Sequence, residues 1–177
     1  MNIIVFGAQG TGKSTYARYI AEKLCVPYVY SGDLFRQMSS GNTPLGKKIR
    51  DYVSQGLLVP DEIVISAVID CLKKSDLSNG IVFDGFPRNL KQAKALPTDI
   101  DLVIHITLPE KIILERLLKR GRSDDTIETI RKRLEIYSNE TAPLLKFYQE
   151  NGVKIIEIDN TPPIGVVKRQ IDDLLKK

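Results

Sequence analysis

The side chains best suited to chemistry lie in one string near the start of the chain, Gly7-Ala8-Gln9-Gly10-Thr11-Gly12-Lys13-Ser14. Its spacing, a glycine, four residues, then Gly-Lys-Ser, lets consecutive main-chain N–H groups point inward at phosphate oxygens. Lys13 adds a positive charge for the β- and γ-phosphates, and the helix predicted to follow adds its positive dipole end. The string therefore predicts a site for a nucleoside triphosphate, since an ordinary glycine-rich turn seldom carries the lysine and serine as well.

Two apolar runs frame this loop. Residues 2–6 before it indicate a buried strand, and residues 14–24 after it show a helical pattern. A second apolar run, residues 80–84, ends in the carboxylate of Asp84. Because ligands of open α/β sheets bind at the carboxyl ends of the strands, Asp84 should face the same crevice and orient magnesium or its waters. The alternative is an aspartate that serves only the turn at Asp84-Gly85.

Strands and helices alternate along the chain. The predicted strands are residues 2–6, 27–30, 80–84, 101–107 and 153–158. This alternation predicts a parallel sheet covered on both faces and built from right-handed crossovers. Three helices are predicted between the second and third strands, at about 31–39, 44–55 and 60–72. They exceed what a βαβ connection needs and indicate an inserted subdomain of roughly 30 residues, with Ser31 as the N-cap of its first helix.

The second half of the chain carries further helix signals. Asp125 and Glu128 are spaced as N-cap and capping-box partner of a long helix, and Pro143 should kink or restart that helix. A closing amphipathic helix is predicted at 164–175. His105, the only histidine, lies within a predicted strand and is interpreted as packed or rim-exposed rather than catalytic.

The composition is that of one globular domain of 177 residues, 42% hydrophobic and 27% charged. The net charge of +4 can indicate nucleic acid, but a cleft for two polyphosphates needs many arginines, so no nucleic-acid partner is predicted. Neither a signal segment nor an apolar run of membrane length is recognised, which favours a cytoplasmic protein without membrane contact. Cys25 and Cys71 are interpreted as two buried thiols rather than as a disulfide or a zinc site.

Arginines gather near predicted strand ends, loops and helix ends: Arg36, Arg88, Arg116, Arg120, Arg122 and Arg133. Arg116 and Arg120 are four residues apart and should project from one side of a helix. Guanidinium groups grip two phosphate oxygens at once, so this set suits the transfer of a phosphoryl group. The alternative, a solvated surface, holds for most arginines in proteins.

Three strings carry a resemblance to a known family: Ser31-Gly32-Asp33-Leu34-Phe35-Arg36, Asp84-Gly85-Phe86-Pro87-Arg88 with Gln92, and Gly121-Arg122-Ser123-Asp124-Asp125 followed by Arg131-Lys132-Arg133-Leu134-Glu135-Ile136-Tyr137. With them the chain resembles the nucleoside monophosphate kinases and, among these, the adenylate kinases. The resemblance implies one P-loop domain over residues 1–177, a three-layer α/β/α fold with a five-stranded parallel sheet in the order 2-3-1-4-5. It also implies a helical monophosphate-binding arm at 31–60 and a short lid at 120–125, without structural zinc.

The resemblance further implies reversible, Mg²⁺-dependent transfer of the γ-phosphate of ATP to AMP, giving two ADP, by a monomer. The residues it implies for ATP are Gly10, Thr11, Gly12, Lys13, Ser14, Thr15, Arg116 and Pro162. Those implied for AMP are Ser31, Arg36, Leu58, Val59, Gly85, Arg88 and Gln92. The cations implied to act on the transferring phosphoryl are Lys13, Arg88, Arg120, Arg122 and Arg133. Those implied for magnesium, mostly through water, are Ser14, Asp33 and Asp84.

Rival functions stay open. A UMP/CMP kinase or a small-metabolite kinase would have the same phosphate loop. The inserted helices and the Asp84–Arg88 string argue against a small metabolite as the acceptor. Only Gln92 separates AMP from UMP and CMP, because the pyrimidine enzymes tend to carry Asn at that point. A nucleotide switch such as a GTPase is a different class, but the chain contains no Asn-Lys-x-Asp or Asp-x-x-Gly motif. A weak relative that binds RNA or a protein partner is supported only by the positive charge.

Overall fold

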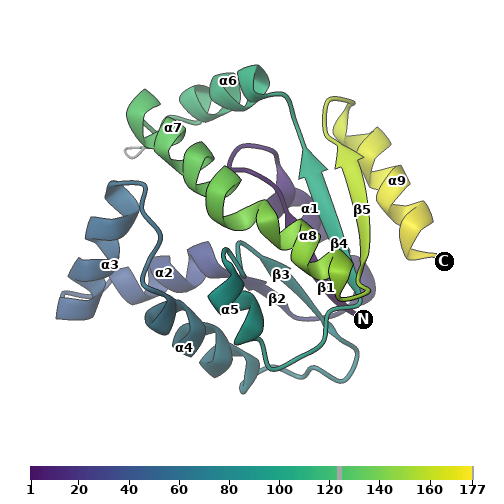
Figure 1. Cartoon of the computed structure of the whole chain (residues 1–177), viewed down its shortest axis with the longest axis horizontal. Coiled ribbons are helices and arrows are strands. Elements are labelled where there is room, and N and C mark those ends of the chain that lie inside the picture. Colours follow the sequence, from purple (N-terminus) through teal and green to yellow (C-terminus); the bar gives the residue numbers. More distant parts are fainter. Residues whose placement is uncertain (123–124, 177) are drawn as a thin grey trace.

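The computed structural model describes residues 1–122 and 125–176. Parallel strands form a five-stranded sheet in the order β2-β3-β1-β4-β5, which confirms the predicted fold (Figure 1). The strands are β1 (Asn2–Phe6), β2 (Tyr28–Tyr30), β3 (Ile81–Asp84), β4 (Leu102–Thr107) and β5 (Lys154–Asp159). β1 pairs with both β3 and β4 at the centre. The loop that follows β1 therefore leaves from the middle of the sheet's carboxyl edge, where ligands of such sheets bind.

Alternate residues of β1 belong to the two main cores of the molecule. Ile4 and Phe6 join one buried cluster, and Ile3 and Val5 join the other. This follows from the two-residue period of a strand, and the strand is apolar throughout because both of its faces are covered. Each of these side chains is at most 4% exposed, so each contributes about 1.5–3 kcal/mol to folding.

Helices cover both faces of the sheet, as predicted. α1 (Lys13–Leu24) and α9 (Ile164–Leu175) pack on one face through Ile20 and Val167. The helices that contribute to the cluster on the other face are α2 (Ser31–Ser39), α3 (Pro44–Ser54), α4 (Asp61–Leu72), α5 (Leu90–Lys94) and α8 (Pro143–Glu150). The first three of these follow β2 in direct succession and lie together at the lower left of Figure 1. The three helices that the sequence predicts between the second and third strands are therefore present, and α2, α3 and α4 together are called the inserted helical segment.

A third apolar cluster holds the phosphate loop against two further helices, α6 (Glu110–Arg120) and α7 (Ile127–Ile136). Ala8 of the loop packs with Ile113 and Leu117 of α6 and with Ile130 of α7. Gly10 approaches the same cluster so closely that an added Cβ would lie 2.9 Å from Cγ of Leu117. The loop and its two neighbouring helices are thus packed as one unit.

Two helix starts differ from prediction. Thr126 caps α7 in place of Asp125, because its hydroxyl oxygen accepts from the N–H of Thr129 at 3.1 Å. Ser31 is the first residue of α2 rather than its N-cap, and its hydroxyl donates to the main-chain oxygen of Gly85 at 2.7 Å. The side chains of Asp125 and Ser31 both have tertiary partners, and these replace the local main-chain bonds that a cap would make.

Pro143 restarts the helix, as predicted. A single π-helical turn at Tyr137–Thr141 follows α7, and Pro143 then occupies the first position of α8. Proline is favoured at a first helical position because its missing N–H has no partner there in any case. The long helical pattern in the sequence is therefore two helices joined by one wide turn.

The cysteines depart in part from prediction. Both thiols are free, but Cys25 is exposed and Cys71 is only half-buried. Cys25 ends α1 in the left-handed region, with φ of +53°. That position ends the helix at the surface, which leaves the thiol of Cys25 exposed where burial was predicted.

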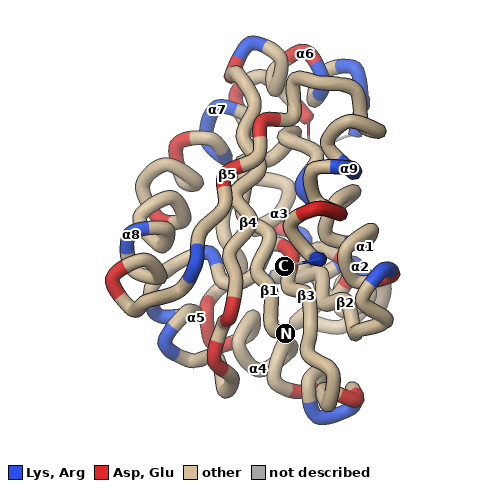
Figure 2. The backbone as a smooth tube through the Cα atoms, turned by 90° about the vertical axis from the view of Figure 1, so that its right-hand side faces the viewer, with Lys and Arg blue, Asp and Glu red and all other residues tan. Residues whose placement is uncertain are grey.

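Charged residues surround the sheet rather than enter its middle. β1, β2 and β4 contain no Lys, Arg, Asp or Glu, and β3 contains only Asp84. Figure 2 shows both signs of charge interleaved along the helices and connections around the sheet. Within residues 1–122 and 125–176, no helix has both the length and the apolar character needed to span a bilayer.

Candidate active site

The phosphate loop closes the turn between β1 and α1, as the sequence predicts. Gly12 has φ of +88°, and an added Cβ would lie 2.6 Å from the side-chain nitrogen of Asn160. Any other residue at position 12 would both strain the backbone and clash. Within the loop, the N–H and the hydroxyl of Thr11 both donate to the main-chain oxygen of Ala8, at 3.3 and 2.9 Å. These bonds fix the loop at the N-terminal end of α1, where free N–H groups favour an anion.

Lys13 belongs to a cluster of charges beside the loop. Burial lowers the pKa of Lys13; the negative charge of Asp84 opposes this shift, and the positive charges of Arg88 and Arg120 add to it. Such influence requires that these groups lie close together. The Nζ of Lys13 is 3.5 Å from the main-chain oxygen of Ala8, so it reaches back over the loop. A polyphosphate bound here would relieve the mutual repulsion of the three cations.

Asp84 is fully buried at the end of β3. Its Oδ2 accepts from the hydroxyl of Tyr28 at 2.8 Å, whereas no hydrogen-bond partner is found for Oδ1 among the described residues. A buried carboxylate oxygen without a partner is costly, and a hydrated cation would satisfy it. Throughout residues 1–122 and 125–176, no group of three His, Cys, Asp or Glu side chains comes together that could hold a metal ion by itself. The donor set therefore fits a Mg²⁺ that keeps water and phosphate oxygens as most of its ligands.

The two other residues predicted for magnesium have different surroundings. Ser14 is half-buried in the first turn of α1. Asp33 forms an ion pair with Arg36 one turn further along α2, and both side chains are about half exposed. The guanidinium of Arg36 also lies over the ring of Tyr30, 5.2 Å from its centroid. The structure thus groups Asp33 with Arg36 on the inserted helical segment.

A cavity of about 400 Å³ opens beside the loop, between α1 and the turn that joins β5 to α9. Its lining includes four of the residues predicted for ATP, Gly12, Thr15, Arg116 and Pro162. The other lining residues are Tyr16, Asn160, Thr161, Pro163 and Ile164. Proline and aromatic surfaces next to a guanidinium suit a flat base, and the position suits a base attached to phosphates in the loop.

Asn160 is a residue of this cavity that the sequence does not single out. It is 5% exposed, its Nδ2 donates to the main-chain oxygen of Thr11 at 2.6 Å, and its Oδ1 accepts from the hydroxyl of Tyr16. Its main-chain oxygen accepts from Arg116 at 3.4 Å. Asn160 therefore ties together the phosphate loop, α1 and α6. In the sequence it looks like a turn residue before two prolines, and no local pattern distinguishes the two roles.

A second group of predicted residues meets at the main-chain oxygen of Gly85. This oxygen accepts from the hydroxyl of Ser31 at 2.7 Å and from Nε of Arg88 at 2.8 Å. Gly85 has φ of +71°, and an added Cβ would lie 2.7 Å from the Ser31 hydroxyl, which accounts for the glycine. Burial lowers the pKa of Arg88, and Tyr30 and Asp84 oppose the shift. A half-buried guanidinium that keeps its charge is well placed to bind an anion.

Gln92 borders this group, one helical turn after Arg88. It is 1% exposed; its Oε1 accepts from the main-chain N–H of Arg88, and its Nε2 donates to Oδ1 of Asp61, both at 2.8 Å. Leu58 is half-buried and Val59 is buried. These two residues lie just before Asp61 in the chain, so the segment that carries them passes near the amide of Gln92.

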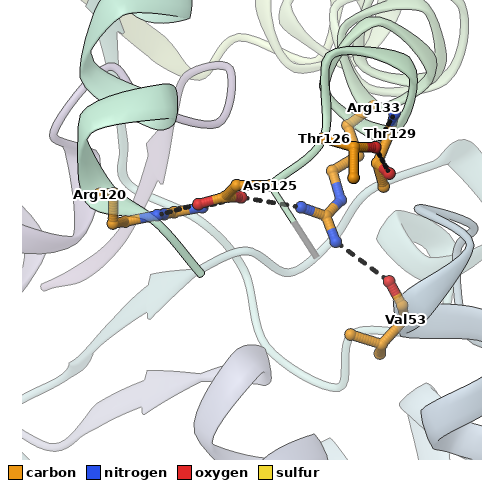
Figure 3. Close-up of polar contacts among 6 residues, drawn as sticks. All are labelled: Val53, Arg120, Asp125, Thr126, Thr129 and Arg133. Carbon is orange, nitrogen blue, oxygen red and sulfur yellow. Dashed lines mark hydrogen bonds and ion pairs between the residues drawn. The ribbon is translucent and has the colours of Figure 1, made fainter. Parts of the chain in front are cut away.

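Asp125 joins two of the arginines predicted to act on the transferring phosphoryl (Figure 3). Arg120 donates to its carboxylate through two nitrogens, at 2.8 and 2.7 Å, and Arg133 donates at 3.4 Å. Arg133 also donates to the main-chain oxygen of Val53 at 3.0 Å. Burial by itself would raise the pKa of Asp125, but the hydrogen bonds and charge of Arg120, with the charge of Arg133, hold it below its usual range.

Gln9 of the phosphate loop faces the same two arginines. With its side-chain oxygen turned toward them, that oxygen accepts from Arg120 at 2.9 Å and from Arg133 at 3.2 Å. Arg122 is exposed, and its main-chain oxygen accepts from the N–H of Asp125 at 2.9 Å. Residues 123–124 of the predicted lid lie outside the described residues. The structure therefore brings Arg120 and Arg133 to the loop and leaves Arg122 at the surface.

His105 is packed away from these groups, in agreement with its predicted role. Its Nε2 lies 3.0 Å from the hydroxyl of Tyr137, and its Nδ1 lies 3.3 Å from a carboxylate oxygen of Glu157. Burial lowers the pKa of His105, and Glu157 opposes the shift.

Comparison with known proteins gives one family. The family model described as adenylate kinase matches residues 5–153. A Cyanothece protein named "Adenylate kinase" is 39% identical over 184 residues, which cover 98% of this chain and 94% of the relative. A protein of the same name from Thermobifida fusca is 41% identical over 187 residues, covering 99% and 98%. A third, from Clostridium botulinum, is 36% identical over 213 residues, covering 99% and 98%.

The parallel sheet, the glycine loop at its central strand and the buried carboxylate on the next strand define a nucleotide-binding protein of the P-loop α/β class. Within that class, the family match and the near full-length relatives show that the chain belongs to the adenylate kinase family. It is therefore a nucleoside monophosphate kinase, a phosphotransferase. The clostridial alignment runs over 213 positions against 177 residues here, so at least 36 positions of that relative have no counterpart in this chain.

Proposed function

We propose that the chain transfers the γ-phosphate of Mg²⁺-bound ATP to AMP, reversibly, giving two ADP. The observation that supports this most directly is the convergence of Lys13, Asp84, Arg88 and Arg120. The charges of Asp84, Arg88 and Arg120 all act on the pKa of Lys13, so three cations from separate parts of the chain lie near one carboxylate. One triphosphate needs the loop and its lysine, and the additional half-buried guanidinium of Arg88 suits a second phosphate group.

The reaction requires positioning of the substrates and neutralisation of charge, and it does not require a general base. The acceptor oxygen belongs to a phosphate that is already ionised at neutral pH, so no proton need be removed before it attacks. The donor and acceptor must be held in line, and the negative charge of the transferring phosphoryl must be neutralised. Lys13, Arg88, Arg120 and Arg133 supply that positive charge in this proposal, together with Arg122 when the segment that carries it closes.

The ATP side is assigned to the phosphate loop and its neighbouring cavity. Main-chain N–H groups of residues 10–15 hold the phosphates, and Lys13 reaches the β- and γ-groups. The adenine occupies the cavity of about 400 Å³, between Arg116 and Pro162. The support is that Gly12 belongs both to the loop and to the cavity lining, and that Thr15 of α1 lines the cavity next to it.

The AMP side is assigned to the residues around Gly85. Arg88 and Arg36 grip the phosphate, Gln92 and Ser31 contact the base, and the segment at Leu58-Val59 borders the ribose and the ring edge. The support is that Ser31 and Arg88 share the oxygen of Gly85 and that Gln92 contacts the main chain of Arg88. Arg36 has to exchange its ion pair with Asp33 for a phosphate.

Magnesium is assigned to Asp84, Asp33 and Ser14, mostly through water. The partnerless Oδ1 of Asp84 supports this, since a water of a hydrated cation would supply the missing donor. A bound Mg²⁺ would offset the negative charge of the donor phosphates. The residues of the chain then need only to orient its waters and to keep the carboxylate of Asp84 pointed at the loop.

Two segments are assigned to closure over the substrates, a helical arm at residues 31–60 and a short lid at 120–125. Closure excludes water, which would otherwise compete with AMP for the phosphoryl group. We infer that the enzyme works as a cytoplasmic monomer with no nucleic-acid or membrane partner.

The test is kcat/KM with ATP as donor and AMP, dAMP, CMP or UMP as acceptor, in the wild type and in Gln92→Asn. We expect AMP to be preferred by about tenfold to a hundredfold in the wild type, because a pyrimidine leaves the buried amide of Gln92 unpaired. Gln92→Asn should reduce this preference. A wild type that prefers UMP or CMP would contradict the assignment and leave a pyrimidine monophosphate kinase of the same fold.

A further inference from the structure

The carboxamide of Gln92 is held by two partners of opposite type. Its Nε2 donates to Oδ1 of Asp61, the first residue of α4, and its Oε1 accepts from the main-chain N–H of Arg88. The same Asp61 oxygen accepts from Nδ2 of Asn89 at 2.8 Å, and the side-chain oxygen of Asn89 accepts from the N–H of Gln92. The amide is thus enclosed in a small network that joins α4 to the start of α5.

These partners allow only one orientation of the amide. An ionised carboxylate can only accept hydrogen bonds, and a main-chain N–H can only donate. If the amide of Gln92 turned by 180°, its oxygen would face the oxygen of Asp61 and its nitrogen would face the N–H of Arg88. Both bonds would be lost at a residue that is 1% exposed, and each would be replaced by a repulsive contact. The protein therefore fixes which end of the amide is the donor before any ligand binds.

A fixed amide can recognise only one arrangement of ligand atoms. A carboxamide has two N–H groups and two lone pairs, and Asp61 and Arg88 use one of each. One donor and one acceptor are left for a base. A 6-aminopurine offers a ring-nitrogen acceptor beside an amino donor, whereas a 6-oxopurine offers a ring N–H donor beside an oxygen acceptor. The two purines thus present opposite patterns, and turning the amide over exchanges one preference for the other.

We propose that Asp61 is a specificity-determining residue of the acceptor site. It does not touch the substrate; by accepting from Nε2, it locks Gln92 in the orientation that takes 6-aminopurine monophosphates and refuses 6-oxopurine monophosphates. The proposal rests on the proposed function, because it requires the acceptor base to lie against Gln92. It extends that function from a choice between purine and pyrimidine to a choice between two purines.

The experiment compares kcat/KM for AMP and IMP, with ATP as donor, in the wild type and in Asp61→Asn. The amide introduced by this substitution can either donate or accept. It can therefore donate to the oxygen of a turned Gln92, so turning Gln92 would lose one hydrogen bond instead of two. We expect the AMP-to-IMP ratio to fall about tenfold, through a loss for AMP together with a gain for IMP. A loss of folding alone would lower both rates and leave the ratio unchanged. Asp61→Glu, which restores an acceptor-only group, should keep the ratio high.

Asp70→Asn is the matched control, because Asp70 lies on the same helix but is exposed, 3.8 Å from Lys73. Its ratio should equal that of the wild type. If Asp61→Asn does not fold, Asp61→Ser replaces it, since a hydroxyl also donates or accepts. An unchanged ratio in folded Asp61→Asn or Asp61→Ser, with AMP preferred by the wild type, overturns the proposal alone. A wild type that prefers UMP or CMP overturns the proposed function and this proposal with it.

Discussion

Arg133 donates to the main-chain oxygen of Val53 at 3.0 Å, across 80 positions of sequence (Figure 3). Val53 lies in the last turn of α3, in the inserted helical segment, whereas Arg133 belongs to α7 and also binds Asp125 beside the lid. Gly56 strengthens this contact, because an added Cβ would lie 2.8 Å from Cγ2 of Thr129. One guanidinium therefore links the end of the proposed arm to the base of the proposed lid.

This link predicts two separate effects of Arg133→Lys. A lysine carries the charge but cannot donate to Val53 and Asp125 at once in a fixed fork. We expect kcat to fall by about a hundredfold, as for the loss of one preorganised charge-stabilising donor. Amide hydrogen exchange at residues 53–57 should become faster without substrate, since their docking contact is weakened.

Arg131→Lys is the control for this variant, because Arg131 lies two residues away on the same helix and is exposed. Both readouts should stay at their wild-type values in this variant. If Arg133→Lys lowers kcat without faster amide exchange at residues 53–57, then Arg133 acts in charge neutralisation only and does not hold the end of α3.

The second prediction concerns Lys13→Met. The lysine is half-buried near two arginines, and its removal from water is the main cause that lowers its pKa, so removing its charge should not destabilise the fold. Loss of a charge on the β- and γ-phosphates should cost several kcal/mol of transition-state stabilisation, a fall of about a thousandfold or more in kcat/KM. The measurements are the melting temperature and coupled-assay turnover, with exposed Lys111→Met as the control. Turnover near the wild-type value would contradict the role given to the loop.

The third prediction uses two glycines in the same conformation. Gly121 ends α6 with φ of +65°, next to the proposed lid, and Gly152 precedes β5 with φ of +78°, with no other atom within 4 Å of an added Cβ. Valine at either position strains the backbone by about 1–2 kcal/mol. Gly121→Val and Gly152→Val should therefore lower the melting temperature by similar amounts.

Only Gly121→Val should also slow turnover per folded molecule, because closure of a lid this short has to pivot near residue 121. The comparison is kcat of the two variants after each is corrected for its folded fraction. Equal kcat values would show that Gly121 is a structural turn, and the pivot would have to lie elsewhere.

The parts that the sequence predicts best are those whose signal is local. The residue types and spacing at 7–14 predict phosphate binding by themselves. The apolar residues 2–6 and 80–84 indicate central strands, so the position of Asp84 follows from the parallel topology. The sheet order, by contrast, is implied only by the family resemblance. Nothing in the periodicity of the chain distinguishes 2-3-1-4-5 from another doubly wound order.

The two wrong helix caps have a common cause, which is competition between a helix N–H and tertiary partners for the same side chain. Asp125 has the spacing of an N-cap, but two guanidinia bind a carboxylate more strongly than a helix N–H does, and Thr126 caps instead. Ser31 likewise gives its hydroxyl to the oxygen of Gly85. Asp61 carries no signal at all in the sequence beyond its place in the first turn of a helix. Such pairings become visible only in the fold, which joins residues 5 and 8 positions apart at Asp125, 28 positions apart at Asp61 and 54 positions apart at Ser31.

The last prediction concerns Asn160, whose side chain spans the phosphate loop and the ATP-side cavity. Asn160→Ala removes the bond to the main-chain oxygen of Thr11 and leaves the hydroxyl of Tyr16 without its acceptor, at a site that is 5% exposed. We expect a loss of about 1–3 kcal/mol in stability and a rise of about tenfold in KM for ATP, because loop and cavity are no longer held in register. KM for AMP should not change, since none of these contacts reaches Arg88 or Gln92. The check is to vary each substrate at saturating levels of the other, and an equal rise in both KM values would mean that Asn160 supports the fold as a whole rather than the ATP side.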